Sequence, residues 1–403
     1  MNFFMTRTLF ISEKLPLPDH ASGDLRFFSL LNILTATSEV HLAVFGWPAQ
    51  KAKLGETRFD HYQSLLSKHG IHLHLGHVPA LLRSGDWEII AFEFYHAARP
   101  EWIIEARYHN PKAKLVIDSV DVHFKRLHEK AKITGERKDF EQAEKTRRGE
   151  LLAYNRADFI LAVTETDQQH INHYLPKAKT ALVPNIHQIH SPELNSPENT
   201  CRLVFVGGFQ HDPNIDAVLY FCRDVLPRIA ARIPVEVYII GSSPPPQLCK
   251  LNSNSIFVTG HVEDTLPYLK RSHISIAPLR YGAGMKGKIG EAMAAGLPVV
   301  TTSVGAEGFG CTPGEHILVG DTPEVFAEHI VSLCKDPILY EKIRLAGWDF
   351  IREHYSEESL RHQVLETFEN ILASQPKPLP WRERLTKSLQ IEYERHLAWR
   401  FRT

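Results

Sequence analysis

No stretch of the chain stays apolar for the roughly 18–20 residues that a membrane-spanning helix needs. An excess of charge of one sign is also lacking, since 46 lysines and arginines stand against 47 aspartates and glutamates. This balance excludes a global basic field for nucleic acid or an acidic membrane, so any basic site must be local. The N-terminal segment has no charged region followed by a long apolar run, and we expect no signal peptide.

Cysteine is scarce and unpatterned. The five cysteines are odd in number, scattered, and free of CxxC spacing. They are Cys201, Cys222, Cys249, Cys311 and Cys334. Such a set favours reduced, mostly buried thiols, and with them a cytoplasmic location or the inner face of a membrane.

Two histidine-rich stretches, at 72–77 (HLHLGH) and 187–190 (HQIH), are spaced as metal ligands can be, but neither brings a third and a fourth ligand with it. An alternating pair on a strand is more often a surface feature, so the sequence predicts no metal site. A P-loop, a nucleophile elbow and a zinc-protease helix are also absent from the chain.

A β-type apolar run, a turn and an amphipathic helix occur in this order twice. The runs are residues 8–12 (TLFIS) and 201–208 (CRLVFVGG), and Gly, Pro or Asp follows each. Further apolar runs alternate with helical patterns at 40–46, 87–94, 114–120, 158–164 and 180–185, and at 235–241, 255–260, 274–279, 298–302 and 316–320. Continuous apolar strands between helices predict parallel sheets covered on both faces. The predicted fold class is α/β, with two Rossmann-like domains in tandem.

Composition divides the chain into four parts. We expect a first domain over 1–186, a linker rich in Pro, Ser and Asn over 187–200, and a second domain over 201–373. A basic and aromatic tail, 374–403, follows the Pro-rich break and is predicted to be helical. It either packs back on the first domain, which we favour, or contacts a membrane surface. The mixed-charge segment 123–158 is predicted to be a solvated helical excursion.

The strongest chemical signal follows a buried strand of the second half. There RYGAGMKGKIGEAM places Arg280, Gly284, Lys286 and Lys288 at the start of a helix, with Glu291 one turn further on. Glycines let the backbone approach a ligand, and a helix N-terminus offers free N–H groups and partial positive charge. Together with the cations these features suit a diphosphate. From the residues alone, a Gly-rich loop with solvated lysines remains the alternative.

The stretch 280–308 resembles the donor-site signature of family-four glycosyltransferases, which have the GT-B fold. The matching positions are Arg280, Gly282, Gly284, Lys288, Glu291, Gly296, Pro298, Thr302, Gly305, Glu307 and Gly308. The resemblance covers nearly the whole chain up to about residue 373. It is strong over most of the second half and weaker over the first. It implies a UDP- or GDP-sugar donor held by the second domain and an acceptor on the first. It also implies retention at the anomeric carbon and no required metal or other cofactor.

The resemblance also implies roles for single residues. Lys288 would contact the diphosphate with help from Arg280 or Lys286, and Glu291 would hold the ribose. Ala283 stands where relatives have a first glutamate, so contacts to the donor sugar must come from elsewhere.

Two further features of the second half bear on these missing contacts. The backbone after Gly305, with Glu307, is one substitute for the first glutamate, and a plain turn is the alternative. In the loop after the strand 201–206, relatives carry an arginine and a lysine that this chain lacks. Gly207 and Gly208 still permit close backbone approach, and His211 is either a contact or a surface turn residue.

In the first half, relatives use a glycine in the position of Gly23 to admit the donor phosphate, and a turn before a helix N-cap is the alternative. Asp121 lies near the place of a histidine beside the reacting sugar. It would accept a hydrogen bond from a sugar hydroxyl. Alternatively, it would cap the following helix and pair with Arg126.

These observations predict a metal-independent hexosyltransferase-like enzyme of retaining type. Its catalytic residues would be Lys288, Lys286 and Asp121, and its acceptor a saccharide or lipid-linked molecule in polysaccharide or glycolipid synthesis, with no nucleic-acid partner. The alternatives are a GT-B enzyme of other chemistry, such as an epimerase or a phosphorylase, and a catalytically degenerate binding module.

Overall fold

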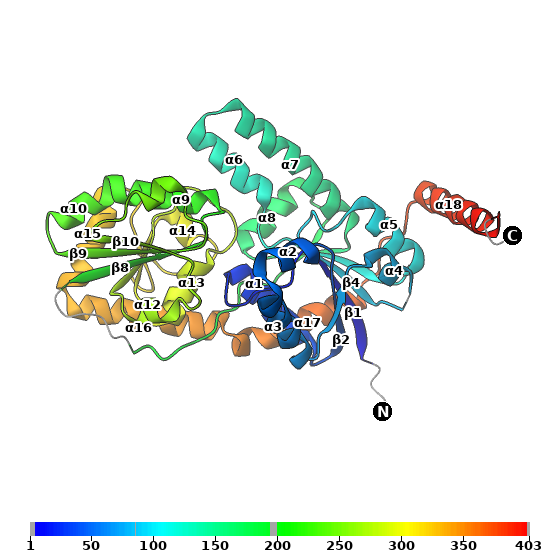
Figure 1. Cartoon of the computed structure of the whole chain (residues 1–403), viewed down its shortest axis with the longest axis horizontal. Helices are drawn as coiled ribbons and strands as arrows, with labels where there is room; N and C mark the ends of the chain where they lie inside the picture. The colour runs from blue at the N-terminus through cyan, green and yellow to red at the C-terminus, as the bar shows by residue number, and fades with distance from the viewer. Residues whose placement is uncertain (1–4, 85, 194–199, 401–403) are drawn as a thin grey trace.

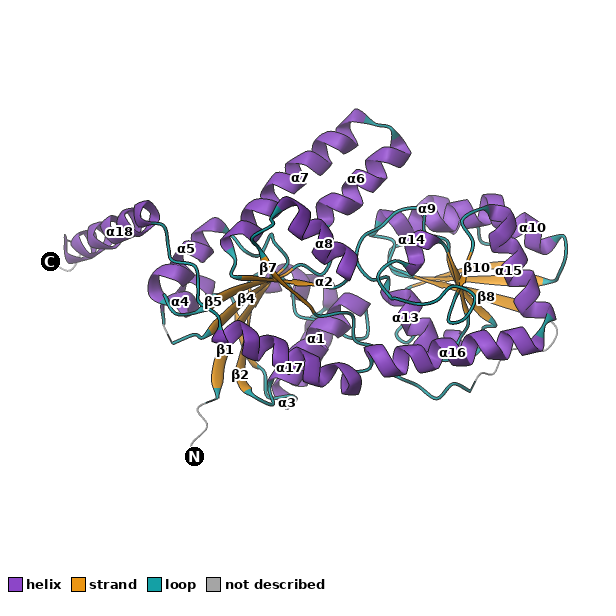
Figure 2. Ribbon diagram, turned by 180° about the vertical axis from the view of Figure 1, so that it is seen from behind, coloured by secondary structure: helices purple, strands orange, loops and turns teal. Residues whose placement is uncertain are grey.

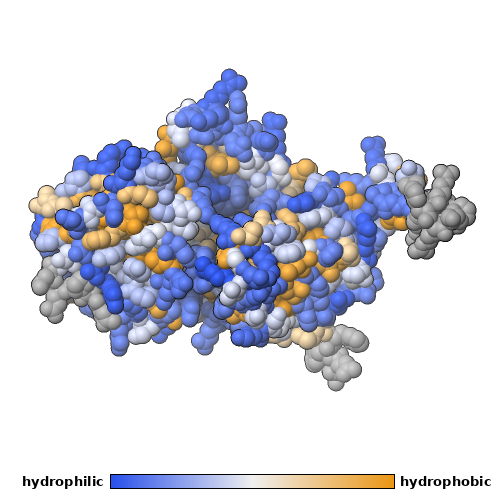
Figure 3. All heavy atoms as spheres, in the orientation of Figure 1, coloured by the Kyte–Doolittle hydropathy of each residue, from blue (hydrophilic) through white to orange (hydrophobic). Residues whose placement is uncertain are grey.

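The structure is a computed structural model that describes residues 5–84, 86–193 and 200–400. Two α/β domains lie side by side, a helical hairpin projects between them, and a C-terminal helix extends from the far side of the first domain (Figures 1 and 2). In the space-filling view a notch separates the two lobes, and the hairpin rises above it as a largely hydrophilic projection (Figure 3).

The first domain is built on a seven-stranded parallel sheet with the order β3-β2-β1-β4-β5-β6-β7. The strands are β1 (Thr6–Ser12), β2 (Ser38–Val44), β3 (His72–Leu75), β4 (Ile89–Glu93), β5 (Lys114–Asp118), β6 (Phe159–Ala162) and β7 (Lys179–Leu182). Separate apolar cores lie on its two faces, because the central strands are apolar along their whole length.

Eight helices follow these strands in the described part of the first domain. They are α1 (Ser22–Leu34), α2 (Trp47–Leu54), α3 (Glu56–Lys68), α4 (Val78–Arg83), α5 (Pro100–His109), α6 (His123–Thr134), α7 (Arg137–Arg156) and α8 (Glu165–Tyr174). Helices α6 and α7 form the projecting hairpin, and Gly135 between them takes a left-handed conformation (φ 67°) that ends α6. The prediction of a helical excursion is confirmed, but not all of its charged side chains are solvated, since some of those on α6 contact the second domain.

The second domain has a six-stranded parallel sheet with the order β10-β9-β8-β11-β12-β13. The strands are β8 (Cys201–Val206), β9 (Val235–Ile240), β10 (Ile256–Gly260), β11 (Ile274–Ala277), β12 (Val299–Thr301) and β13 (Leu318–Val319). The helices are α9 (Asp212–Tyr220), a π-helical turn (Phe221–Val225), α10 (Leu226–Ala230), α11 (Pro246–Cys249), α12 (Leu266–Lys270), α13 (Gly287–Ala294), α14 (Ser303–Ala306), α15 (Pro323–Lys335) and α16 (Pro337–Tyr355). Two parallel-sheet α/β domains are what the sequence predicts.

After α16 the chain returns to the first domain. Helix α17 (Glu357–Ala373) packs on α1, and its buried side chains join the core around Phe10. The rings of Phe10 and Phe368 lie 6.3 Å apart. Assigning residues 357–373 to the second domain is therefore wrong. The amphipathic pattern of α17 specifies an apolar face but not the core that the face covers.

The last helix, α18 (Trp381–Arg400), packs on α5 of the first domain, as favoured from the sequence. Lys387 Nζ lies 2.5 Å from Glu105 Oε1, in a buried ion pair. Four apolar side chains of α18 remain largely exposed, namely Trp381, Leu385, Leu389 and Tyr393. Among the described helices, none combines the length and the apolar character that crossing a bilayer requires.

The cysteines depart from expectation at one pair. Cys201 on β8 and Cys334 near the end of α15 form a disulfide, whereas Cys222, Cys249 and Cys311 are free and Cys249 is exposed. The expectation of five reduced thiols is wrong, because the fold brings together two residues 133 positions apart.

Candidate functional site

The N-termini of α1 and α13 meet where the two domains face each other. A β-carbon on Gly287, the first residue of α13, would lie only 1.8 Å from Ser22 Oγ at the start of α1. Only glycine fits this contact. Each helix start presents unpaired N–H groups and partial positive charge, and each follows a central strand of its sheet. The crevice between the domains therefore has a positive pole contributed by both.

Two lysines at the start of α13, Lys286 before its first residue and Lys288 in its first turn, add charge to this pole. Lys288 Nζ donates a hydrogen bond to Asn214 Oδ1 at 2.6 Å and lies 5.1 Å from the centre of the Phe205 ring. Lys286 Nζ lies 3.3 Å from Glu307 Oε2. Burial lowers the pKa of Lys288 to about 8, and it lowers the pKa of Lys286 against the attraction of Glu307. An anion in the crevice would favour the charged form of both lysines.

The loop after β8 orients Lys288. A β-carbon on Gly207 would lie 2.7 Å from Asn214 Nδ2 and 3.1 Å from Lys288 Cε, so glycine makes room for both side chains. Asn214 Nδ2 donates to the Gly208 carbonyl at 2.8 Å, which aims its oxygen at the lysine. The structure thus brings Gly207, Gly208 and Lys288 together, and Asn214 connects them.

Glu291 and Arg280 have different surroundings. Glu291 lies one turn into α13 and accepts a hydrogen bond from Thr265 Oγ1. Burial raises the pKa of Glu291, and the hydrogen bond partly offsets this. Arg280 is exposed and forms an ion pair with Asp216 on α9, with Nε 2.8 Å from Oδ2. The structure does not place Arg280 with the two lysines.

Glu307 connects the second domain to the hairpin of the first. Its Oε1 lies 2.7 Å from Lys125 Nζ on α6, while Oε2 faces Lys286. Burial tends to raise the pKa of Glu307, but the two lysines outweigh this effect and lower it. Gly305 is required by packing, since a β-carbon there would lie 1.9 Å from Thr301 Oγ1.

Gly23, Asp121 and Gly284 come together on the first-domain side of the crevice. Gly284 has φ +65°, and a β-carbon there would lie 3.0 Å from Asp121 Cβ. A β-carbon on Gly23 would make only an ordinary contact, 3.8 Å from Val120 Cγ1, so no packing reason requires glycine there. Val120 itself has φ +54°, which is strained for a β-branched residue and typical of functional loops.

Asp121 lies between two partners rather than at a helix cap. Its carboxylate lies 3.0 Å from His123 Nδ1 and 3.3 Å from Arg126 Nε. The buried Glu150 of α7 instead accepts from the first two N–H groups of α6, at 3.2 and 3.0 Å. Burial tends to lower the pKa of His123, but Asp121 and Glu150 outweigh this effect and raise it. The capping role of Asp121 is wrong, and its pairing with Arg126 is confirmed.

Sequence reasoning missed the contacts that α6 makes with the second domain. Besides Lys125, Arg126 Nη1 lies 2.9 Å from His211 Nδ1 and Lys130 Nζ lies 2.5 Å from Asp212 Oδ2. Burial lowers the pKa of His211 to about 4, so its ring is a neutral acceptor for Arg126. A mixed-charge helix gives no signal that distinguishes such contacts from solvated charges.

A cavity of about 480 Å³ lies between α6, α7 and α8, and Lys125, which contacts Glu307 in the crevice, forms part of its wall. It is lined by Phe124, Lys125, His128, Glu129, Phe140, Ala143, Glu144, Arg147, His170 and Tyr174. The rings of Phe124 and Tyr174 lie 5.4 Å apart, and Arg147 covers the Tyr174 ring at 5.2 Å. Aromatic faces next to charged and polar groups make this cavity amphipathic.

Comparison with solved structures identifies the fold that the two domains form together. Sucrose-phosphate synthase from Thermosynechococcus elongatus superposes with a TM-score of 0.66 at 14% identity, over 91% of this chain and 99% of that one. HepE from Anabaena, in complex with UDP, gives 0.66 at 14% identity, over 91% and 100%. The chain has the GT-B fold. The predicted fold class is therefore confirmed, and the crevice described above is the cleft between the two GT-B domains.

Sequence comparison adds two findings within this GT-B framework. Residues 200–336 match the family described as "Glycosyl transferases group 1", a match that lies in the second domain. An uncharacterized 44.6 kDa protein in the cps region of Klebsiella pneumoniae is 25% identical over 178 residues, which is 42% of this chain and 46% of that protein. The match thus spans less than half the length of that relative.

Proposed function

We propose that the protein is a retaining glycosyltransferase that moves a sugar from a UDP- or GDP-sugar to a saccharide or lipid-linked acceptor. The observation that carries the proposal is the meeting of the α1 and α13 N-termini beside Lys286 and Lys288 in the cleft. The group 1 match of the second domain supports it, as does the likeness to HepE, whose structure holds UDP.

In the proposed reaction the bond between the anomeric carbon and the diphosphate oxygen breaks, and the oxygen of the acceptor hydroxyl bonds to the same face of the sugar. The proton of that hydroxyl passes to the departing diphosphate oxygen. The departing diphosphate gains negative charge as this bond breaks. Fixed cations and helix N–H groups stabilise that charge without reorganisation, which is the largest contribution in many enzymes. The diphosphate would replace Asn214 at Lys288 and Glu307 at Lys286, so no divalent metal is needed in this scheme.

The donor sugar would lie between Asp121 of the first domain and Glu307 of the second. Both carboxylates already lie next to the Gly-rich loop, Asp121 against Gly284 and Glu307 against Lys286. Their oxygens are acceptors for sugar hydroxyls and would supply the contacts that Ala283 cannot make. Glu291, buried one turn into α13, would accept the ribose hydroxyls.

For the acceptor we propose the cavity between α6, α7 and α8. Lys125 lines this cavity and also contacts Glu307, so the cavity adjoins the proposed donor position. Sugar rings pack their C–H faces on aromatic side chains and hydrogen-bond through their edges, and Phe124, Tyr174 and His170 provide both kinds of contact. The relative from a cps region favours a polysaccharide product.

We further propose a cytoplasmic location with peripheral membrane contact through α18. The exposed Trp381, Leu385, Leu389 and Tyr393 recur every four residues, and so they share one face of that helix. Co-sedimentation with anionic vesicles, compared between the full chain and a Trp381→Ala/Leu389→Ala variant, tests this contact. Equal sedimentation of both would contradict it.

The experiment that tests the proposed function is a panel of UDP- and GDP-sugars incubated with the protein in the presence of EDTA. We expect one donor to release its nucleotide, slowly to water and faster when an oligosaccharide acceptor is present. Release that requires Mg²⁺ would contradict the metal-independent scheme. Nucleotide binding without release from any donor would favour a degenerate binding module, and turnover of a sugar phosphate without nucleotide would favour a phosphorylase.

A further inference from the structure

Two histidine-bearing strands lie side by side at one edge of the first-domain sheet. Glu39 and His41 belong to β2, and His72 and His74 belong to the edge strand β3. In the parallel register His41 lies opposite His72. Side chains two residues apart on a strand share a face, so all four side chains lie on the same face of the sheet.

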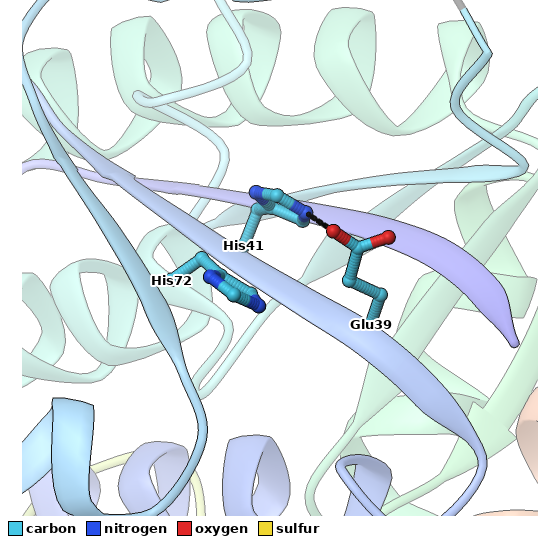
Figure 4. Close-up of side chains that lie close together, drawn as sticks. All are labelled: Glu39, His41 and His72. Carbon is cyan, nitrogen blue, oxygen red and sulfur yellow. Dashed lines mark hydrogen bonds and ion pairs between the residues drawn. The ribbon is translucent and has the colours of Figure 1, made fainter.

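Three of these side chains offer ligand atoms that converge. One atom each from Glu39, His41 and His72 lies within 4.8 Å of the others. His41 Nε2 is 2.9 Å from Glu39 Oε1, and the rings of His41 and His72 stack with their centres 4.8 Å apart (Figure 4). This site supplies the ligands that the histidine-rich stretch 72–77 lacks by itself.

We propose that Glu39, His41 and His72 bind one divalent transition-metal ion of the Zn²⁺ class. Imidazole nitrogen with carboxylate oxygen is a ligand set that Zn²⁺ prefers, with metal–ligand distances of about 2.0–2.2 Å. Ligand atoms around such an ion are roughly 3.3 Å apart. The separation of 2.9 Å between His41 and Glu39 is near that value, and rotations of the half-exposed Glu39 and the exposed His72 would close the set and leave a fourth position for water.

A second layer of contacts holds the central ligand in place. His41 is buried, and its Nδ1 lies 2.9 Å from His74 Nε2, while its ring and that of Trp87 pack in a T shape with their centres 4.9 Å apart. Because Nδ1 is engaged by His74, Nε2 is the nitrogen turned toward Glu39. A partner on the second ring nitrogen is what typically orients a metal-bound histidine.

One neighbouring charge opposes metal binding. Arg7 Nε lies 3.3 Å from Glu39 Oε2, and its guanidinium covers the Trp87 ring at 4.5 Å. The arginine engages the carboxylate oxygen that does not face His41, so the metal ligand Oε1 stays available. We expect the repulsion to weaken binding rather than prevent it, and the site to be one of moderate affinity.

The metal would stabilise the edge of the sheet rather than take part in the transfer reaction. Glu39 and His72 lie at the N-terminal ends of their strands and His41 at the middle of β2, whereas the proposed donor site lies at the carboxyl ends. Strand β3 pairs with β2 over only four residues, so an ion between them would add a second connection.

The test uses the untagged full chain, stripped with EDTA and dialysed. Titration with Zn²⁺ in a calorimeter should show one saturable site, and Co²⁺ should give visible absorption bands of a low-symmetry nitrogen–oxygen site. His72→Ala removes an exposed ligand with little risk to folding, and we expect it to weaken Zn²⁺ binding at least tenfold. Glu39→Gln should weaken it similarly, and His61→Ala, an exposed histidine on α3, should not.

Thermal unfolding gives a second measurement, because an ion that binds only the folded chain raises its stability. Zn²⁺ should raise the Tm of the wild type and of His61→Ala, but not that of His72→Ala. Binding that does not saturate, or equal affinity in the wild type and His72→Ala, would overturn the proposal. Neither measurement involves nucleotide or sugar, so the result is independent of the proposed function.

Discussion

Lys125 Nζ and Glu307 Oε1 lie 2.7 Å apart across the boundary between the two domains. The other oxygen of the same carboxylate faces Lys286, 3.3 Å away. One side chain therefore joins the projecting hairpin to a cation of the proposed donor site. A diphosphate would compete with Glu307 for Lys286 but not for Lys125, so donor binding and the domain contact are coupled through a single residue.

Glu307→Gln should tighten the binding of UDP by about three- to tenfold, since it removes the anion that competes with the diphosphate for Lys286. The lysine–glutamate contact that UDP must otherwise break contributes roughly 1 kcal/mol net. The same substitution should lower kcat, because a neutral amide holds a sugar hydroxyl less strongly than a carboxylate does. Titration calorimetry with UDP and steady-state kinetics measure the two effects. Glu263→Gln, at an exposed site of the same domain, is the control. Weaker UDP binding in Glu307→Gln would show that the competition does not exist.

Lys288→Ala should lower kcat on the order of 10²–10³, the typical loss when one charge-stabilising group of a transition state is removed. Its loss also removes the lysine donor from Asn214 Oδ1, so a Lys288→Met variant, which fills the space without charge, is a useful companion. Lys250→Ala, at an exposed lysine of the same domain, should retain full activity. Unchanged turnover in Lys288→Ala would remove this lysine from the mechanism.

The pH dependence of donor binding should follow Lys288. Burial lowers its pKa to about 8, so the lysine is charged below that pH and loses its proton as the pH rises through it. Affinity for UDP-glucose, whose phosphates keep the same charge in this range, should be constant from pH 6 to 7 and fall above about pH 8. Near pH 8 binding should take up a proton, which calorimetry in two buffers detects. In Lys288→Met the fall should disappear, and its persistence would assign it to another group.

Gly287→Ala should separate the N-termini of α1 and α13. The new β-carbon would lie 1.8 Å from Ser22 Oγ and 2.1 Å from Ser22 Cβ, and rotation of the serine moves only the first of these atoms. Displacements of about 1 Å in a site typically cost near 10² in rate, so we expect a loss of that order in kcat/KM.

Ser22→Gly removes both clashing atoms and should restore most of the activity when combined with Gly287→Ala. Thermal unfolding should change little in either variant, because the contact lies between the domains and not in a core. A double variant that is no more active than Gly287→Ala would show that the serine is not the obstacle.

The strands could be predicted from the sequence because buried parallel strands are apolar along their whole length. Runs such as 114–120 and 235–241 enclose β5 and β9 within two residues of the observed ends. The Gly-rich loop could also be predicted, because glycines directly before a helix are typical of a backbone that another group approaches closely. In the structure Gly284 and Gly287 each occupy a position where a side chain would collide.

Contacts between distant segments could not be predicted in the same way. Nothing in the sequence around Glu150 shows that its carboxylate accepts from the first N–H groups of α6. Lys125 has the appearance of one solvated charge among many in a mixed-charge helix. One residue of the proposed metal site, His72, stands out in the sequence as part of HLHLGH. Only the strand register places His41, 31 residues earlier, opposite it. Such relationships follow from topology, which local pattern does not determine.

The return of α17 to the first domain makes the first lobe depend on chain from both sides of the second lobe. Leu360, Val364 and Phe368 fill the core around Phe10, so a fragment ending after residue 186 would leave that core open to water. The polypeptide crosses the cleft once near residue 190 and again near 356, where His187 and Ser356 form a bridge. Because both crossings lie together at this bridge, any relative movement of the two lobes must bend the two segments at the same place.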